Sequence, residues 1–119
     1  MECPRLPPHI RLEPHAKGYG VSESAGFQVP VVTTPEAIHT GLMHREDVGH
    51  GMLFAFQTPR TPSFWMKNTL VPLDMEFLDA DFNIVDAHRN VQPGDLTLRT
   101  SRSPVCFVLE RPAARESAD

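Results

Sequence analysis

The chain has 119 residues, of which 40% are hydrophobic and 22% are charged, and its formal net charge is −4 at pH 7. This length suits one ordinary domain, and the composition is typical of neither a disordered polyelectrolyte nor a membrane protein. The acidic balance argues against a general nucleic-acid-binding protein, because phosphate contacts need a basic face.

Residues 1–26 are expected to form an extended arm, because proline, glycine, serine and scattered charges dominate and no helix or strand period is present. The arm contains no apolar run of the ~7–15 residues that a signal peptide needs, and the chain has no run of ~20 for a membrane span. We therefore expect a soluble chain, cytoplasmic when made. The candidate partner-binding residues of the arm are Pro4, Pro7, Pro8 and Tyr19.

Residues 27–32 open the predicted domain, which extends over 27–110, with a strand whose Pro30 suits an edge or a bulge. A short helix is predicted over about 35–44. Two patterns favour its start: Thr34 as a cap with Pro35 in the first turn, or a capping box from Thr33 to Glu36.

Short apolar runs separated by turn residues predict the remaining strands of the domain, and residues 111–119 are expected to form a polar tail. The predicted strands are 52–56, 63–67, 73–78, 82–88, 96–99 and 105–110. Many short strands with one helix are typical of a compact β-sandwich or barrel. Twelve prolines and seven glycines also argue against a helical bundle.

The two cysteines, Cys3 and Cys106, lie far apart in the chain. A disulfide between them is chemically allowed, but their spacing does not suggest one. Cys106 lies in the apolar run 105–109, which favours a buried small hydrophobic residue. No Cys-x-x-Cys occurs, so a structural zinc ribbon is excluded, and we expect no cofactor.

Three segments, taken together, resemble a known family. They are residues 34–45, 51–56 and 63–79, and the most specific block within them is Phe64-Trp65-Met66-Lys67-Asn68-Thr69. Over about residues 27–110 the chain resembles the domain of unknown function 192 family. The resemblance implies a small β-sandwich of jelly-roll type with one short helix, and it implies no established enzymatic activity or cofactor. Members of the family commonly carry an export or lipoprotein signal ahead of the domain.

The chain differs from the family at both ends, where it has a proline-rich arm and a shortened C-terminus. Small jelly-roll domains with extended arms serve in virus particles as decoration or cement proteins. By this fold-level analogy we expect a non-catalytic structural module in a larger assembly, most concretely a bacteriophage capsid decoration protein. Its expected partners are capsid subunits or copies of itself, with no direct contact to nucleic acid or membrane.

The alternative function is the binding of a small ligand by Trp65, Lys67, Asn68 and Asp74. Lys67 and Asp74 flank a tight turn and could pair, while Asn68 can bond the turn backbone. A purely structural interpretation, in which these residues fix the connection between two strands, stays open. If Trp65 is exposed beside Lys67, a binding surface is favoured.

A third interpretation is a hydrolase that uses acidic residues concentrated around one hairpin. These residues are Asp74, Glu76, Asp79, Asp81 and Asp86. Paired carboxylates can perform acid–base chemistry, but Asp74 and Glu76 share one face of a predicted strand, which favours a solvent-facing side. No catalytic constellation emerges, so we expect no enzyme.

Two loops contain residues that could bind a metal ion, but the sequence predicts a metal site in neither. The residues His44, Asp47 and His50 lie close together in a loop and could meet on a divalent ion. The turn from Asp79 to Asp81 could hold calcium, but it lacks a full calcium-loop pattern.

Overall fold

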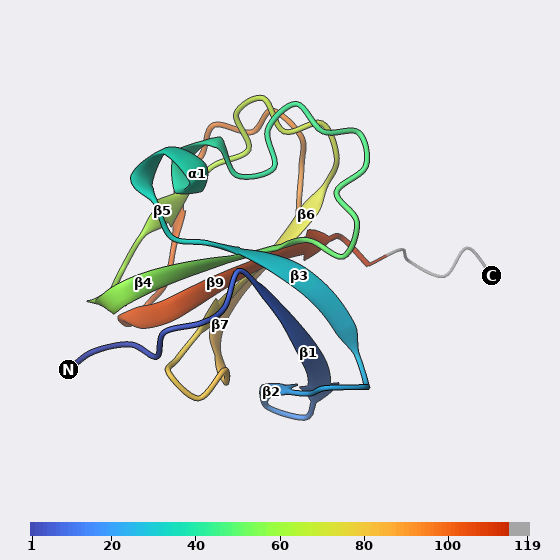
Figure 1. Ribbon diagram of the computed structural model, residues 1–119. Helices are drawn as coiled ribbons and strands as arrows, with labels where there is room; N and C mark the ends of the chain where they lie inside the picture. Colours follow the sequence, from blue (N-terminus) through green and yellow to red (C-terminus); the bar gives the residue numbers. More distant parts are fainter. Residues whose placement is uncertain (115–119) are drawn as a thin grey trace.

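The computed structural model describes residues 1–114, which form a curled seven-stranded sheet with a short helix and a two-stranded ribbon above one face (Figure 1). The strands are β1 His9–His15, β2 Gly18–Val21, β3 Phe27–Val32, β4 Met52–Arg60, β5 Ser63–Phe64, β6 Leu73–Leu78, β7 Ile84–Val91, β8 Arg99–Thr100 and β9 Val105–Pro112. The sheet order is β2-β1-β3-β4-β9-β6-β7, and β5 pairs with β8. The mainly β class is confirmed. No helix within the described part of the chain has the length and apolar character needed to cross a lipid bilayer.

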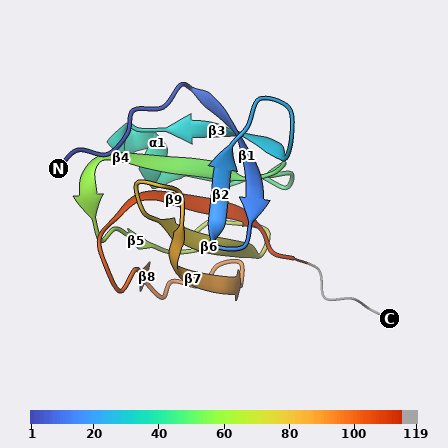
Figure 2. The same ribbon diagram turned by 90° about the horizontal axis from the view of Figure 1, so that it is seen from below.

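The segment expected to be an arm contributes two strands to this sheet, so the extended-arm prediction for residues 1–26 is wrong for this part. β1 pairs with both β2 and β3 in antiparallel register. Figure 2 shows the β1–β2 hairpin crossing below the central strands. Ile10 and Leu12, the two apolar residues of β1, point into the core and are 5% and 0% exposed. The remaining residues of β1 are polar or proline, so no clear period marks it in the sequence.

The sheet curls until its two ends approach each other. Gly18 of β2 forms an isolated bridge with Asn83, which precedes β7. The amide of Tyr19 donates to the carbonyl of Phe82 at 3.0 Å, and the amide of Ile84 donates to the carbonyl of Lys17 at 2.8 Å. The sheet is therefore a half-barrel with an inner and an outer face.

Pro30 lies within β3, which is an inner strand of the sheet rather than the expected edge. β3 pairs with β1 from Phe27 to Pro30 and then in parallel with β4 from Val31 to Val32. Pro30 lies where one pairing ends and the other begins. Its missing N–H is tolerated there, since proline within a sheet needs a place that requires no donor.

Hydrophobic residues cover both faces of the sheet, and each face has its own core. Alternate residues of β4 divide between them: Leu53 and Ala55 face the inside of the half-barrel, while Phe54 and Phe56 face outward. Burial on both faces explains why β4 and β9 are continuous apolar runs rather than alternating ones.

The helix α1 runs from Pro35 to Thr40 and is shorter than the predicted 35–44. Thr34 caps it by accepting a hydrogen bond from the amide of Ala37 at 3.2 Å, with Pro35 in the first turn. It ends at Gly41, whose φ of 47° is in the region that favours glycine. At the other end of the chain, β9 includes residues 111 and 112 of the predicted tail, and residues 115–119 lie outside the described part.

Cys3 and Cys106 form a disulfide across a sequence separation of 103 residues. The spacing of the cysteines allowed this disulfide but did not suggest it, and the predicted burial of Cys106 agrees with its exposure of 2%. The amide of Cys3 also donates to the carbonyl of Gln57 at 2.8 Å. These contacts fix the N-terminal residues against β4 and β9.

A candidate ligand pocket beneath the helix

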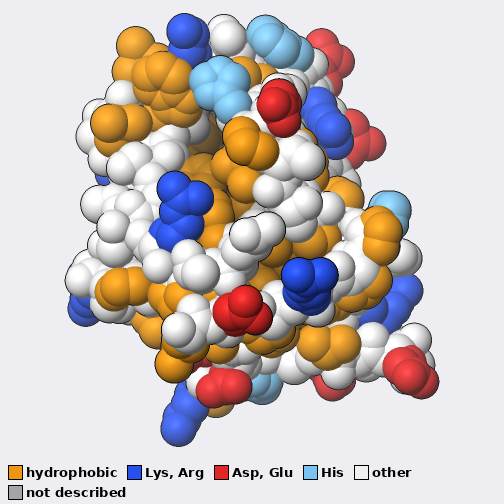
Figure 3. All heavy atoms as spheres, turned by 60° about the vertical axis from the view of Figure 1, so that its left-hand side comes forward, with side chains coloured by type: hydrophobic (Ala, Val, Ile, Leu, Met, Phe, Trp, Pro, Cys, Tyr) orange, Lys and Arg blue, Asp and Glu red, His pale blue; other side chains and the backbone are white. Residues whose placement is uncertain are grey.

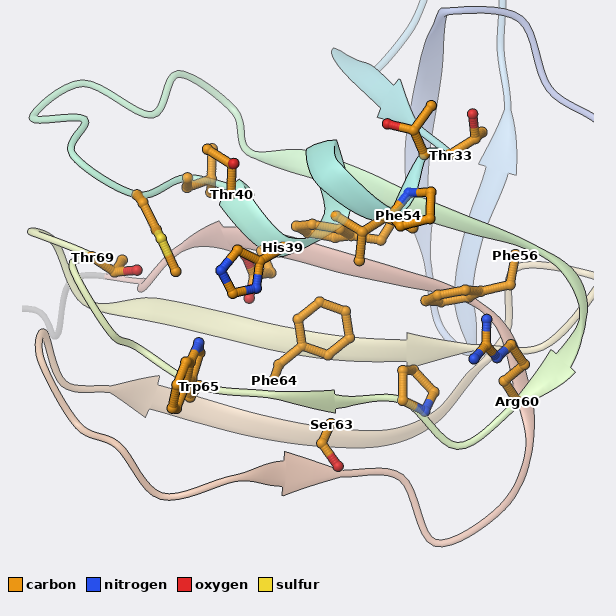
Figure 4. A pocket seen from close by; sticks show the side chains of 18 of the residues that line it. Thr33, His39, Thr40, Phe54, Phe56, Arg60, Ser63, Phe64, Trp65 and Thr69 are labelled. Atoms are coloured by element: carbon orange, nitrogen blue, oxygen red, sulfur yellow. The ribbon is translucent and has the colours of Figure 1, made fainter.

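A pocket of about 940 Å³ lies on the outer face of the sheet, between α1, β4 and β5. Three phenylalanines, Phe54, Phe56 and Phe64, provide its apolar surface. Figure 4 shows these rings around the space beneath α1, with His39 and Trp65 toward one end and Arg60 toward the other. In Figure 3, hydrophobic side chains are visible inside a hollow on this side of the molecule.

Local packing holds the helix at the distance that keeps this space open. A Cβ atom on Gly41 would lie 3.3 Å from the ring of Phe54, so the end of the helix rests closely on that ring. Phe54 in turn packs edge-to-face on Phe64, with 4.9 Å between ring centroids. The rings are thus in contact with one another and with the end of the helix.

Glu110 is the acidic residue among those that line the pocket, and it is only 4% exposed. It projects from β9, where Met52 of β4 and Met75 of β6 flank it in the register. Burial raises the pKa of Glu110 to about 8, and no other influence offsets that burial. Among residues 1–114, the carboxyl group has neither a hydrogen-bond donor nor a cation as its partner.

Two cations of the chain rest on aromatic rings beside the pocket. The guanidinium of Arg60 lies 5.7 Å from the centroid of Phe56, and the ammonium of Lys67 lies 5.3 Å from the Trp65 ring. Both cationic residues are exposed. The rings of Phe56 and Trp65 are therefore accessible to positive charge, and cation–π attraction is favourable there.

The structure does not bring the four predicted ligand residues together. Trp65 lines the pocket, and Lys67 lies next to it over its ring. Asn68 is in a turn at φ 55°, and its carbonyl accepts a hydrogen bond from the amide of His44 at 2.8 Å. Asp74 is elsewhere: it accepts from the amide of Asn90 at 2.8 Å and does not pair with Lys67.

The expectation that Asp74 and Glu76 face solvent is wrong, since they are 8% and 3% exposed. Glu76 accepts a hydrogen bond from Arg89 at 2.7 Å and another from the hydroxyl of Tyr19. Arg111 donates to the same hydroxyl at 2.9 Å. The β1–β2 hairpin covers this face and brings Tyr19 to it, which the pattern of one strand cannot reveal.

Tyr19 also differs from its predicted role as a partner-binding residue. It is 3% exposed and packs edge-to-face on Phe27, so it is unavailable to a partner at the surface. Burial, followed by its hydrogen bond to Glu76, raises the pKa of Tyr19 to about 12. Pro4, Pro7 and Pro8, the other candidates, are exposed.

The acidic hairpin residues make structural contacts. The carboxylate of Asp79 accepts from the amides of Asp81 and Asn83, which closes the turn. Asp86 accepts from the side chain and the amide of Arg102, and these hydrogen bonds lower its pKa to about 2. Asp81 is exposed.

The described residues contain no group of three or more His, Cys, Asp or Glu side chains arranged to hold a metal ion. In the loop that contains His44, Asp47 and His50, the carboxylate of Asp47 accepts a hydrogen bond from the amide of Gly49 at 2.8 Å. His50 packs against Phe27 with 5.6 Å between ring centroids.

The sequence-based reasoning missed Glu110, His39 and Arg60. A weak signal was present for Glu110, because it ends the apolar run 105–109 and lies two residues after Val108, on the same face of the strand. His39 and Arg60 are isolated polar residues, and only the fold places them at one pocket.

The chain matches the family model of DUF192, described as "Uncharacterized ACR", over residues 20–117, so it belongs to that family. Among curated proteins there is no match. A solved structure from Sinorhizobium meliloti 1021, described as a "putative transcription regulator", is similar with a TM-score of 0.74 and 34% identity, covering 88% of this chain and 79% of that one. A protein of unknown function from Novosphingobium aromaticivorans is similar with a TM-score of 0.71 and 27% identity, covering 89% of this chain and 73% of that one.

Proposed function

We propose that this member of the domain of unknown function 192 family is a non-catalytic domain that binds a small organic molecule in the pocket beneath α1. The observation that carries the proposal is Glu110, which lines the pocket, is only 4% exposed and has no partner for its carboxyl group among residues 1–114. Burial of such a group costs free energy unless a hydrogen bond or an opposite charge compensates it. A bound molecule would supply that partner.

The size and lining of the pocket support the same proposal. A volume of about 940 Å³ lies within the ~300–1,000 Å³ typical of ligand sites. Such sites combine an apolar and aromatic lining with a few polar groups that orient the ligand. Here the rings of Phe54, Phe56 and Phe64 provide the lining, and Glu110 and Thr69 provide buried polar groups.

A fragment screen by ligand-observed NMR tests the proposal, with Trp65 fluorescence as a second signal. Trp65 is the single tryptophan of the chain and lines the pocket, so its emission reports locally. We expect fragments that bind the native chain and change the fluorescence of Trp65. Their affinity should fall in the variant Phe64→Ala, because this substitution widens the pocket. Leu98→Ala is the matched control, because Leu98 is 62% exposed and lies outside the pocket.

The proposal fails if no fragment binds, or if the hits map by chemical-shift perturbation to surfaces away from Phe54, Phe64 and Glu110. Folding of each variant is checked from its amide spectrum. A variant that loses the native spectrum is replaced by Trp65→Phe, which keeps a ring in the half-buried position and is read by ligand-observed NMR alone, because it contains no tryptophan.

The role as a decoration or cement protein in an assembly depended on a free N-terminal arm. Because β1 and β2 are strands of the sheet itself, that support is lost. The assembly role stays a prediction from the sequence. A hydrolase mechanism on the acidic hairpin has no supporting observation either, since Asp79 and Asp86 are engaged in turn and ion-pair contacts.

A further inference from the structure

We propose that the ligand of this pocket is a small organic cation, an ammonium or amidinium group on an apolar body. The inference rests on the proposed function and names the chemical class of the ligand. Its basis is an acid that has neither a hydrogen-bond donor nor a cation as its partner among residues 1–114, and the aromatic rings that line the same pocket.

Glu110 has no charged residue opposite it on either neighbouring strand. The strands on either side of β9 place Met52 and Met75 opposite it, and neither carries a charge. The other titratable residues that line the pocket are His39 on α1 and Arg60 on β4, and both are exposed. In its ionised form, Glu110 therefore has no countercharge from the described chain, and a cationic ligand provides one.

The rings provide the second part of the site. Phe54, Phe64 and Trp65 present faces and edges to the same space. A cation gains from a ring face as well as from a carboxylate, and both gains are larger where water is excluded. The apolar body of such a ligand would cover the part of the half-buried Trp65 ring that is otherwise in contact with water.

An anionic ligand fits the buried side of the pocket poorly, because it would place a second negative charge against Glu110 or require that residue to stay protonated. A neutral ligand with a carbonyl oxygen could accept a hydrogen bond from protonated Glu110. The two remaining classes therefore differ in the protonation state of Glu110 that they require, and pH separates them.

A cation binds the ionised form and releases the proton of Glu110. Its affinity should rise by about tenfold per pH unit between pH 6 and 8, and then level off. A neutral acceptor binds the protonated form. Its affinity should be constant below pH 8 and should fall by about tenfold per unit above it.

The experiment compares three probes of nearly equal shape: benzamidinium, benzamide and benzoate. Each is titrated into the full chain by calorimetry and by Trp65 fluorescence at pH 6, 7, 8 and 9. The variants are Glu110→Gln, the control Glu13→Gln, which removes an exposed acid on β1, and His39→Asn, which removes the imidazole that lines the pocket.

We expect benzamidinium to bind most tightly, with the rising pH dependence described above. Glu110→Gln should abolish that dependence and weaken binding at pH 9 by at least about tenfold. Glu13→Gln should leave the affinity and its pH dependence unchanged, and His39→Asn, which alters the pocket lining, should retain the rise of affinity with pH. The inference is overturned if benzamidinium affinity is flat from pH 6 to 8, or if Glu110→Gln leaves it unchanged. Should the variant fail to fold, the pH profile of the native chain decides alone.

The failure of this inference differs from the failure of the proposed function. If benzamide or benzoate binds at the pocket and benzamidinium does not, the cation class is wrong and the binding function stands. If none of the probes binds and the fragment screen also finds nothing at Trp65, both are wrong.

Discussion

Tyr19 and Glu76 are 57 residues apart in sequence and share a buried hydrogen bond that joins β2 to β6. The bond connects two strands that the sheet order separates widely. Arg89 and Arg111 complete the cluster by donating to Glu76 and to the tyrosine hydroxyl. The cluster therefore helps to hold the half-barrel in its curled form.

Replacement of Tyr19 by Phe tests this role. The change keeps the ring packed on Phe27 and removes only the hydroxyl. We expect the free energy of unfolding to fall by about 1–3 kcal/mol, because Glu76 loses a buried donor. Urea denaturation measures it, and a cycle with Glu76→Gln separates the pair from its neighbours. A loss below about 0.5 kcal/mol would show that Arg89 alone satisfies Glu76.

The disulfide between Cys3 and Cys106 should contribute strongly to stability, since it closes a loop over 103 residues. For a loop of that length the chain-entropy estimate is about 4–5 kcal/mol. We expect the double variant Cys3→Ser/Cys106→Ser to lose that amount in urea denaturation and to show faster exchange of the backbone amide at position 3. The native chain in reductant is the matched control and should approach the stability of the variant. Equal stability of oxidised and reduced chains would contradict the prediction.

Much of the fold could be predicted from local patterns. β3, β4 and β9 coincide with apolar runs, β6 with an alternation of apolar and acidic residues, and α1 with a capping signal. β1 was missed because only Ile10 and Leu12 mark its buried face, and two residues do not establish a period. Its strand character depends on pairing with β3, which is a tertiary contact.

Of the four predicted ligand-binding residues, only Trp65 lines the pocket. The partners of Asp74 and Glu76 come from other strands, so a strand that alternates apolar and acidic residues was interpreted as half solvated. Glu110 becomes notable only when the fold shows that it is buried and unpartnered. The disulfide likewise has no local signal, because its two cysteines are joined through the fold alone.

Gly51 should resist substitution because β9 passes very close to it. It has φ 114°, and an added Cβ would lie 1.9 Å from the backbone oxygen of Glu110. Gly51→Ala should therefore displace β9 at the pocket and destabilise the chain by about 2–4 kcal/mol. Gly49→Ala is the matched control, because Gly49 also has a positive φ of 57° but has nothing within 4 Å of the added atom. Equal effects of the two substitutions in urea denaturation would rule out the close contact as the cause.

Glu110 should make the stability of the ligand-free chain fall as pH rises. Burial raises its pKa from 4.5 to about 8 in the folded chain. Between these values the folded state binds more protons than the unfolded state, so the free energy of unfolding decreases with pH and levels off above 8. The full effect is at most about 5 kcal/mol, since one pKa unit corresponds to about 1.4 kcal/mol. Urea denaturation at pH 5 and pH 8.5 measures the difference.

Glu110→Gln keeps the shape of the side chain and removes its titration, so this variant should lose that decrease in stability. Glu13→Gln, which removes an exposed acid on β1, should retain it. Because a cation would bind the ionised form, saturating benzamidinium should reduce the decrease in the native chain and leave Glu110→Gln unaffected. If the native chain and Glu110→Gln show the same pH dependence, Glu110 is already compensated in the folded chain. The pocket would then lack the unpartnered charge that favours a cationic ligand.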